Sequence, residues 1–297
     1  MKSEVETYSV WASASVRKLA GQRWQGRPVS SPEETLGDCP GLVAVGGGRM
    51  MDQAKYFRAR RRPGMRLVLV PSIWGSGAEC SPIVVLNRGG SKHIENDAAF
   101  LPDDVIYWPE LLQSVPPERA RQACGDVWSH ALEAFLSPLS SDEIQSQLAS
   151  LLGELLRLPL MADARWFDVS ARACQLQARS SVGLVHGIAH VLEAPITSQY
   201  PSDNWGHAKL CSVFLWPVME LNRQNSSKWS DCCAQYKVDD SAVSSVLAEL
   251  HAREAYRQTL PLLKEHWSRI LRDPCTRTNG TLVRQQAVSF FEGWVNR

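Results

Sequence analysis

Apolar positions in the first third of the chain form short runs. Residues 42–45 are a continuous apolar run that ends in glycines, and residues 66–70 form a second run stopped by Pro71. Such runs are typical of strands in a parallel sheet that is buried on both faces. Residues 83–86, followed by a turn signal at 87–90, and residues 105–107 predict two more strands. With a helix expected just after Gly48, the pattern predicts an α/β region.

From Pro116 onward, the apolar positions recur with helical spacing. This spacing predicts helices over residues 118–136, 142–158, 169–192 and 241–271. We place the boundary near residues 109–117. The predicted fold is an α/β amino-terminal domain with an abbreviated parallel sheet, residues 1–112, followed by an all-α domain, residues 113–297.

Composition and charge narrow the classes of partner. The 297 residues are 44% hydrophobic, which is enough for packed cores, and the formal net charge is only +1. No overall field therefore draws the chain to nucleic acid or to anionic membranes. We expect a small-molecule or protein partner, no nucleic acid and no membrane, because no apolar segment approaches the length of a membrane span.

The amino terminus and the cysteines predict a cellular location. Residues 1–20 lack the uninterrupted apolar segment of a signal peptide. The eight cysteines show no paired CxxC spacing, which argues against a zinc ribbon or a disulfide scaffold. We therefore expect reduced thiols in a cytoplasmic protein.

Five side chains in the second part of the chain have the spacing of a metal site. Asp126 and His130 lie four residues apart in a helical pattern, and His186 and His190 repeat that spacing. Side chains at i and i+4 share one helical face and can share a cation. His207 follows at the start of another expected helix. A lone histidine is usually a satisfied or solvated side chain, but two such pairs with a carboxylate favour a metal site.

The same segments resemble the iron-dependent (group III) alcohol dehydrogenases. That family carries G-x-D-A-L-x-H-A-x-E, which is matched here by Gly125, Asp126, His130, Ala131 and Glu133. It then carries L-x-H-G-x-A-H, which is matched by Leu184, His186, Gly187, Ala189 and His190. The resemblance covers roughly residues 41–223 and implies the fold shared with dehydroquinate synthase.

The resemblance implies a role for each of the five residues. Asp126, His130, His186 and His207 would bind the metal, and His190 would lie beside it in a proton-relay or orienting role. Three imidazoles and one carboxylate suit Fe²⁺ or Zn²⁺, and the family favours iron. The assignment of His207 is the least well matched, because Ala208 replaces the usual glycine after it.

Two segments in the first domain are candidates for binding a nucleotide cofactor. Glycines after a strand let a phosphate approach a helix amino terminus, although a structural turn is the simpler interpretation. The family has G-G-G-S-x-x-D-x-A-K at the position of residues 46–55, and Arg49 replaces the serine. Residues 71–81 resemble the family's P-T-T-x-G-T-G-S-E-x-T loop, which lines nicotinamide and pyrophosphate. The implied contacts with NAD or NADP are Gly46, Gly47, Gly48, Arg49, Asp52, Ser72, Gly75, Ser76 and Ser81.

The family normally begins with another βαβ unit, and few residues precede Gly46 here. We expect what remains before the strand at residues 42–45, through residues 9–11 and 14–19, to supply one strand and one helix at most, as in an amino-terminally shortened member of the family. The nucleotide pocket would then be abbreviated, or completed by another subunit of a homo-oligomer such as a homodimer.

The function that the resemblance implies is hydride transfer between an alcohol and NAD(P)⁺ at a metal in the cleft between the two domains. The substrate would be a small-molecule or peptide alcohol. A β-hydroxy acid or a peptide ending in threonine would allow oxidative decarboxylation, as in natural-product tailoring within a biosynthetic complex. Two alternatives stay open: a dehydroquinate-synthase-like lyase that uses NAD transiently, and a noncatalytic partner subunit.

Overall fold

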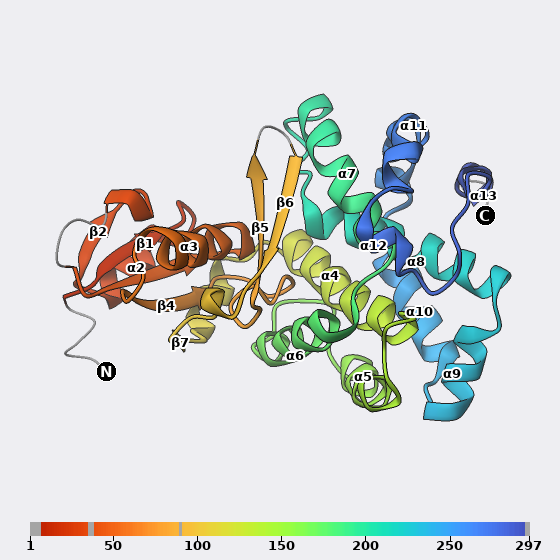
Figure 1. The fold of residues 1–297 in the computed structure, drawn as a ribbon, viewed down its shortest axis with the longest axis horizontal. Coiled ribbons are helices and arrows are strands. Elements are labelled where there is room, and N and C mark those ends of the chain that lie inside the picture. Colours follow the sequence, from red (N-terminus) through yellow and green to blue (C-terminus); the bar gives the residue numbers. More distant parts are fainter. Residues whose placement is uncertain (1–6, 35–38, 89–90, 295–297) are drawn as a thin grey trace. The chain divides into compact units, whose positions relative to one another are not determined.

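The computed structural model describes residues 7–34, 39–88 and 91–294. It divides into two compact units (Figure 1). The first, here called the sheet unit, is Met1–Pro117 with Ala162–Gln175, and the second, the helical unit, is Glu118–Met161 with Leu176–Arg297. An α/β region followed by an all-α region was the predicted fold class, and it is confirmed. The boundary between the two domains, predicted between residues 112 and 113, stays a prediction.

The sheet unit contains a five-stranded parallel sheet of order β2-β1-β3-β4-β7. Its strands are β1 Ser9–Ala12, β2 Arg27–Val29, β3 Gly41–Gly46, β4 Arg66–Pro71 and β7 Asp104–Val105. Its other elements are α2 Arg17–Arg23, α3 Gly48–Arg61, the hairpin β5 Ile83–Arg88 with β6 Ser91–Asn96, and the 3-10 helices η1 Pro32–Glu34, η2 Ala98–Phe100 and η3 Pro109–Ser114.

Both faces of the central strands are buried, which explains their continuous apolar runs. Val43 and Val45 of β3 pack on one face, in the cluster that contains Ala20 of α2. Leu42 and Ala44 pack on the other face against α3. Because successive side chains of a strand point to opposite faces, a strand covered on both sides needs an apolar residue at every position.

The amino-terminal prediction was wrong by one strand. Beyond the expected strand and helix, β2 pairs in parallel with β1, so β1, α2 and β2 form a short but complete βαβ unit. Only Val29 of β2 is buried, and Pro28 lies within the strand. This edge strand therefore has no apolar run that a sequence pattern could reveal. Residues 1–6 of the segment predicted to lack a signal peptide lie outside the described residues.

The strand predicted at residues 83–86 exists, but it does not belong to the parallel sheet. It is β5, which pairs antiparallel with β6 in a separate hairpin. The sequence of β6 is largely polar and was not predicted. Of the turn predicted between them, Gly89 and Gly90 lie outside the described residues. The strand predicted at residues 105–107 is β7, which ends at Val105.

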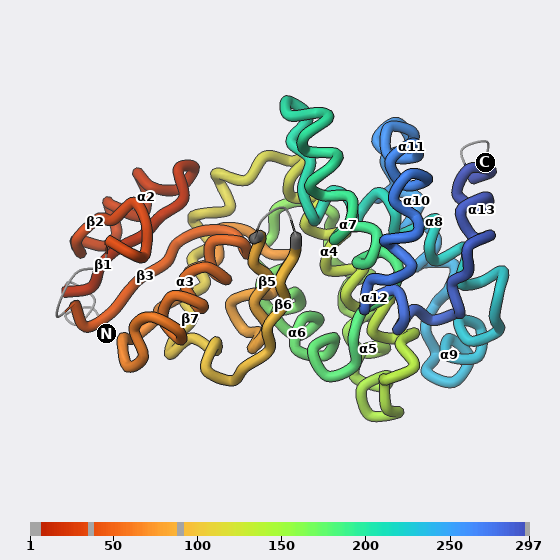
Figure 2. The backbone as a smooth tube through the Cα atoms, turned by 45° about the horizontal axis from the view of Figure 1, so that its top comes forward, coloured from red at the N-terminus to blue at the C-terminus, as the bar shows by residue number. Residues whose placement is uncertain are grey.

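The helical unit packs around two helices, α7 and α8. Helix α7 contacts α8, α11 and α12, and α8 also contacts α9, α10 and α13 (Figure 2). The helices beyond residue 116 are α4 Pro117–Leu136, α5 Asp142–Leu155, α6 Arg165–Ser180, α7 Leu184–Gln199, α8 His207–Asn225, α9 Lys228–Tyr236, α10 Asp240–Leu250, α11 Arg253–Ile270, α12 Pro274–Arg277 and α13 Ala287–Trp294. Residues 165–175 of α6 belong to the sheet unit.

Two predicted long helices are each broken in the structure. The prediction over 169–192 is α6 and α7, separated at Ser181, whose φ is +97°. The prediction over 241–271 is α10 and α11, separated after His251, whose backbone is extended. Both helices of each pair bury an apolar face, so the helical spacing of apolar residues continues across the break. Neither break begins with a glycine or proline, the residues that most often mark the end of a helix.

Within the described ranges, none of the helices combines the length and the apolar character that a membrane span requires.

Candidate metal centre

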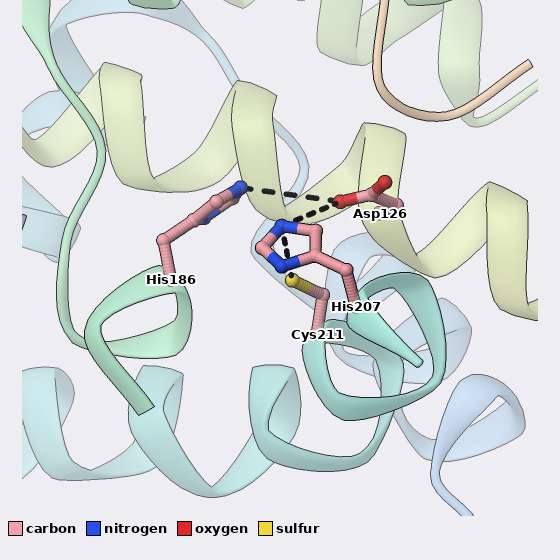
Figure 3. A group of neighbouring side chains, drawn as sticks. All are labelled: Asp126, His186, His207 and Cys211. Carbon is pink, nitrogen blue, oxygen red and sulfur yellow. Dashed lines mark hydrogen bonds and ion pairs between the residues drawn. The ribbon is translucent and has the colours of Figure 1, made fainter. Parts of the chain in front are cut away.

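Three helices of the helical unit bring together four side chains with metal-binding atoms. Asp126 comes from α4, His186 from α7, and both His207 and Cys211 from α8. One ligand atom from each lies within 4.8 Å of those of the other three. Figure 3 shows His186, His207 and Asp126 pointing toward one another, with the sulfur of Cys211 next to the ring of His207.

A glycine lets α4 approach α8 closely at this point. A Cβ atom on Gly125 would lie 2.6 Å from Cβ of Ser212, a distance that real side chains do not tolerate. Gly125 precedes Asp126, and Ser212 follows Cys211. The close approach of the two helices therefore places the carboxylate of α4 beside the potential ligands of α8.

One carboxylate oxygen, Oδ1 of Asp126, is shared by three imidazoles. It lies 3.9 Å from Nε2 of His186, 3.9 Å from Nε2 of His207 and 4.0 Å from Nδ1 of His130. These distances are too long for hydrogen bonds. Ligands that each bind one ion at about 2.0–2.2 Å lie roughly 3–4 Å from each other. The spacing thus fits atoms arranged around a shared cation.

The hydrogen bonding of His186 also supports a shared cation at this position. Its Nδ1 lies 2.6 Å from Oε2 of Glu133, whose oxygens also accept the backbone N–H groups of Val185 and His186. Glu133 is therefore the acceptor, and Nδ1 carries the proton. Nε2 of His186 then presents a lone pair toward Oδ1 of Asp126, and both atoms are buried without a hydrogen-bond partner in the described chain. A cation between two such acceptors would satisfy both, so these residues fit a metal ion.

Burial also changes the charges of these groups. Burial raises the pKa of Asp126, and His130 only partly offsets the rise. Burial lowers the pKa of His186 to about 3, so its imidazole is neutral at pH 7. A neutral imidazole cannot compensate a buried carboxylate, whereas a divalent ion would.

Glu133 joins this cluster to the start of α7. Its carboxylate accepts N–H bonds of 2.6 Å from Val185 and 3.4 Å from His186, in the first turn of α7. A carboxylate at a helix amino terminus is favourable, because it satisfies free N–H groups and interacts with the helix dipole. Burial raises the pKa of Glu133 to about 7, against the opposing effect of these N–H groups. One residue thus caps α7 and orients His186.

His190 lies beside the cluster, in a second group with Asp273 and Cys275. Its Nδ1 is 3.4 Å from Oδ2 of Asp273 and 3.9 Å from Sγ of Cys275. Its ring stacks on that of His207, with centroids 5.5 Å apart. Burial raises the pKa of Asp273, but the hydrogen bond and charge of His190 and the hydrogen bonds from Cys275 together outweigh this effect, so the pKa is lowered overall.

The structure places all five sequence-predicted residues in one region of the helical unit, and it adds three that the sequence analysis did not single out. His130 lies close by, with its ring centroid 4.5 Å from that of His186, but the group whose ligand atoms all lie within 4.8 Å of one another contains Cys211 in its place. The available signal for Cys211 was its position four residues after His207. Glu133 was matched only as part of a family pattern, and Asp273 had no signal.

Within the sheet unit, the two predicted nucleotide segments lie side by side. Gly47 is the N-cap of α3, and a side chain on Gly48 would collide with Ser76. Gly75 and Gly77 have φ values of +119° and +57°, which favour glycine. The helix amino terminus and the glycine-containing loop therefore form one adjacent pair of backbone segments.

The polar residues predicted in these segments have different surroundings. Arg49 is exposed on the first turn of α3. The buried carboxylate of Asp52 accepts bonds of 3.0 Å from Lys55 Nζ and from the backbone N–H of Val85. Ser72 and Ser81 are buried, and Oγ of Ser81 accepts the N–H of Ile83. Contact of any of them with a cofactor stays a prediction, and Asp52 already joins α3 to β5.

Comparison with known proteins adds an independent line of evidence. The model of the iron-containing alcohol dehydrogenase family matches residues 35–109. The chain is 32% identical to maleylacetate reductase 2 of Cupriavidus pinatubonensis over 192 residues, 61% of this chain and 50% of that protein. It is 25% identical to the probable alcohol dehydrogenase EutG of Salmonella typhimurium, over 84% of this chain and 71% of that protein. The match thus spans about half the length of the first of these relatives.

The fold matches the same family. The structure of an iron-containing alcohol dehydrogenase from Thermococcus thioreducens superposes with a TM-score of 0.74, covering 99% of this chain and 95% of that one at 19% identity. At this identity, the likeness shows the fold alone. Taken with the sequence matches, it shows that the chain is similar to iron-containing alcohol dehydrogenases in part of its sequence and in its fold.

Proposed function

We propose that the chain is a metal-dependent, NAD(P)-linked oxidoreductase that acts on an alcohol. The single observation that carries this proposal is the arrangement of three imidazoles around one buried oxygen of Asp126, at 3.9, 3.9 and 4.0 Å. The proposed ligands are Asp126, His130, His186 and His207. Fe²⁺ is the proposed ion on family grounds, with Zn²⁺ as the alternative, because the same ligand types suit both.

When bound, the ion would stabilise the alkoxide form of the alcohol, and the nicotinamide would accept the hydride. The protein's own contribution begins with charge and orientation. Asp126 supplies the negative charge of the site, and Glu133 fixes His186 with its Nε2 lone pair toward Asp126. A ligand that is already oriented loses less freedom when the ion binds.

His190 is the proposed proton relay. If Nδ1 donates its proton to Oδ2 of Asp273, 3.4 Å away, Nε2 is the atom that accepts the proton released by the alcohol. Asp273 would then act as a positioning residue, because it selects the tautomer of His190 without contacting the substrate. This assignment gives His190 a role distinct from that of the three metal-binding histidines.

The proposed cofactor contacts lie in the sheet unit. The amino terminus of α3, at Gly47 and Gly48, offers free N–H groups to a phosphate, and the exposed guanidinium of Arg49 adds a positive charge. Ser76, which lies against Gly48, would add a hydroxyl contact. The additional phosphate of NADP would need a basic site such as Arg58, Arg60 and Arg61 in the last turn of α3, but Arg60 already pairs with Glu95 and Asp97. This pairing favours NAD.

The names of the relatives support an acidic substrate as the finer proposal. One relative is named maleylacetate reductase and another a probable alcohol dehydrogenase. An alcohol that also bears a carboxylate, such as a β-hydroxy acid or a peptide ending in threonine, would combine both features. Oxidation of such a substrate yields a β-keto acid that loses CO₂, as in natural-product tailoring.

The decisive experiment combines metal analysis with nucleotide titration and turnover. We expect about one equivalent of iron or zinc per chain, saturable binding of NADH or NADPH, and net formation of reduced cofactor from an alcohol. Cofactor that is bound but never released in reduced form, with substrate still consumed, would favour the dehydroquinate-synthase-like lyase. Metal without any nucleotide binding would favour the noncatalytic partner subunit.

Assembly and location stay proposals. A homodimer, alone or within a biosynthetic complex, is testable by light scattering of the purified protein. A cytoplasmic location stays a proposal that rests on the sequence, in which the eight cysteines show no paired CxxC spacing.

A further inference from the structure

A sulfur atom lies among the proposed metal ligands. Cys211 follows His207 by one turn of α8, so the two side chains share a helical face. Its Sγ is 3.6 Å from Nε2 of His207, and it belongs to the group whose ligand atoms all lie within 4.8 Å of one another. Figure 3 shows the sulfur beside the ring of His207, on the side of the cluster that α8 supplies.

The simplest alternative is a buried cysteine that only fills space. The surroundings argue against it. Cys211 is fully buried, yet it contacts the carboxylate of Asp126 and the hydroxyl of Ser129. Oδ1 of Asp126 and Nε2 of His186, both within the same group, are buried acceptors without a partner among the described residues. A cysteine that serves only packing would face apolar carbon atoms.

This inference rests on the proposed function. We propose that Sγ of Cys211 is a ligand of the ion that Asp126, His186 and His207 bind. On binding, the thiol loses its proton to solvent and the sulfur coordinates as a thiolate, while the metal keeps its oxidation state. The site would then offer one carboxylate, two imidazoles and one thiolate, with His130 as a further donor 4.0 Å from Asp126.

The consequence concerns metal choice. A thiolate is a softer ligand than an imidazole or a carboxylate, and four-coordinate sites that mix sulfur with nitrogen suit Zn²⁺ well. Cys211 should therefore shift this site toward Zn²⁺, compared with a site of three histidines and one aspartate. Loss of the sulfur should weaken Zn²⁺ binding by about tenfold or more, since even removal of a group that only supports a ligand costs about that much.

The test uses Co²⁺ as the probe in the full-length, metal-exchanged protein. Co²⁺ bound to a thiolate gives a sulfur-to-metal charge-transfer band in the near ultraviolet, which nitrogen and oxygen ligands do not. We expect this band in the wild type, its loss in Cys211→Ser, and its retention in Cys233→Ser. Cys233 is a matched control, because it is also buried in the helical unit but lies on α9, outside both candidate metal groups.

X-ray absorption at the zinc edge gives a second readout that needs no variant. One sulfur at about 2.3 Å, besides nitrogen and oxygen at about 2.0–2.2 Å, is expected in the wild type. Bound metal with no sulfur shell and no charge-transfer band would overturn the role of Cys211 and leave the proposed function standing. A wild type that takes up no metal would overturn both, and metal content alone separates the two failures.

Discussion

The two units differ in how their candidate sites are built. In the sheet unit, the candidate nucleotide contacts, both backbone groups and side chains, lie in two continuous segments, residues 46–52 and 72–81. In the helical unit, the candidate ligands are side chains from α4, α7 and α8, up to 85 residues apart in sequence, as in the pair formed by Asp126 and Cys211. The first kind of site depends on local backbone geometry, whereas the second depends on how helices pack. Substitutions should therefore affect the two sites separately.

The largest expected effect is that of His186→Ala. It removes one ligand and leaves Glu133 without its imidazole partner. We expect metal content to fall to background and turnover to vanish, while the affinity for NADH stays within about twofold of the wild type because the nucleotide segments belong to the sheet unit. Metal analysis and a fluorescence titration measure the two quantities. Unchanged metal content would contradict the ligand assignment.

Glu133→Gln tests whether orientation of a ligand matters as much as the ligand itself. Gln has the same shape, but its amide cannot replace a carboxylate that accepts from Nδ1 of His186 and from the backbone of α7. We expect metal affinity to fall about 10–100-fold, as is usual for a residue that supports a metal-binding histidine. Competition with a chelator measures it. Retention of wild-type affinity would show that the packing of α7 orients His186 without Glu133.

Asp273→Asn should separate proton relay from metal binding. If Asp273 positions Nδ1 of His190, the variant should lose about tenfold in kcat, part of the range that a general base contributes, with metal affinity and KM unchanged. The control is the His190→Asn background, in which the same change should have no further effect on kcat. Additive losses in the double variant would mean that Asp273 acts through another residue.

The smallest expected effect is that of Gly48→Ala in the sheet unit. A methyl group there collides with Ser76, so one of the two nucleotide segments must shift. We expect NADH affinity to fall about fivefold, or about 1 kcal/mol, with metal content unchanged. Adding Ser76→Gly removes the collision and should restore most of the affinity. A titration in which Gly48→Ala binds NADH normally would show that the cofactor does not use this pair of segments.

An element of the fold was predictable where its burial imposes a recognisable pattern of apolar residues along a short stretch of chain. Strands β3 and β4 were predicted closely, because burial on both faces requires apolar residues at every position. Strand β2 was missed because an edge strand of three residues with one buried side chain has no such requirement. The break at Ser181 was missed because both flanking helices keep an apolar face, and an unusual φ at a serine leaves no pattern.

By itself, the sequence determined the order of the two regions, the helical faces that pair Asp126 with His130 and His186 with His190, and the glycines that start α3, because each is decided within a few residues of chain. Only the tertiary structure decided that Cys211 lies among the candidate ligands, that Glu133 orients His186, and that Asp273 reaches His190. Those contacts join distant segments. They depend on close packing such as that of Gly125 against Ser212, which no spacing along the chain encodes.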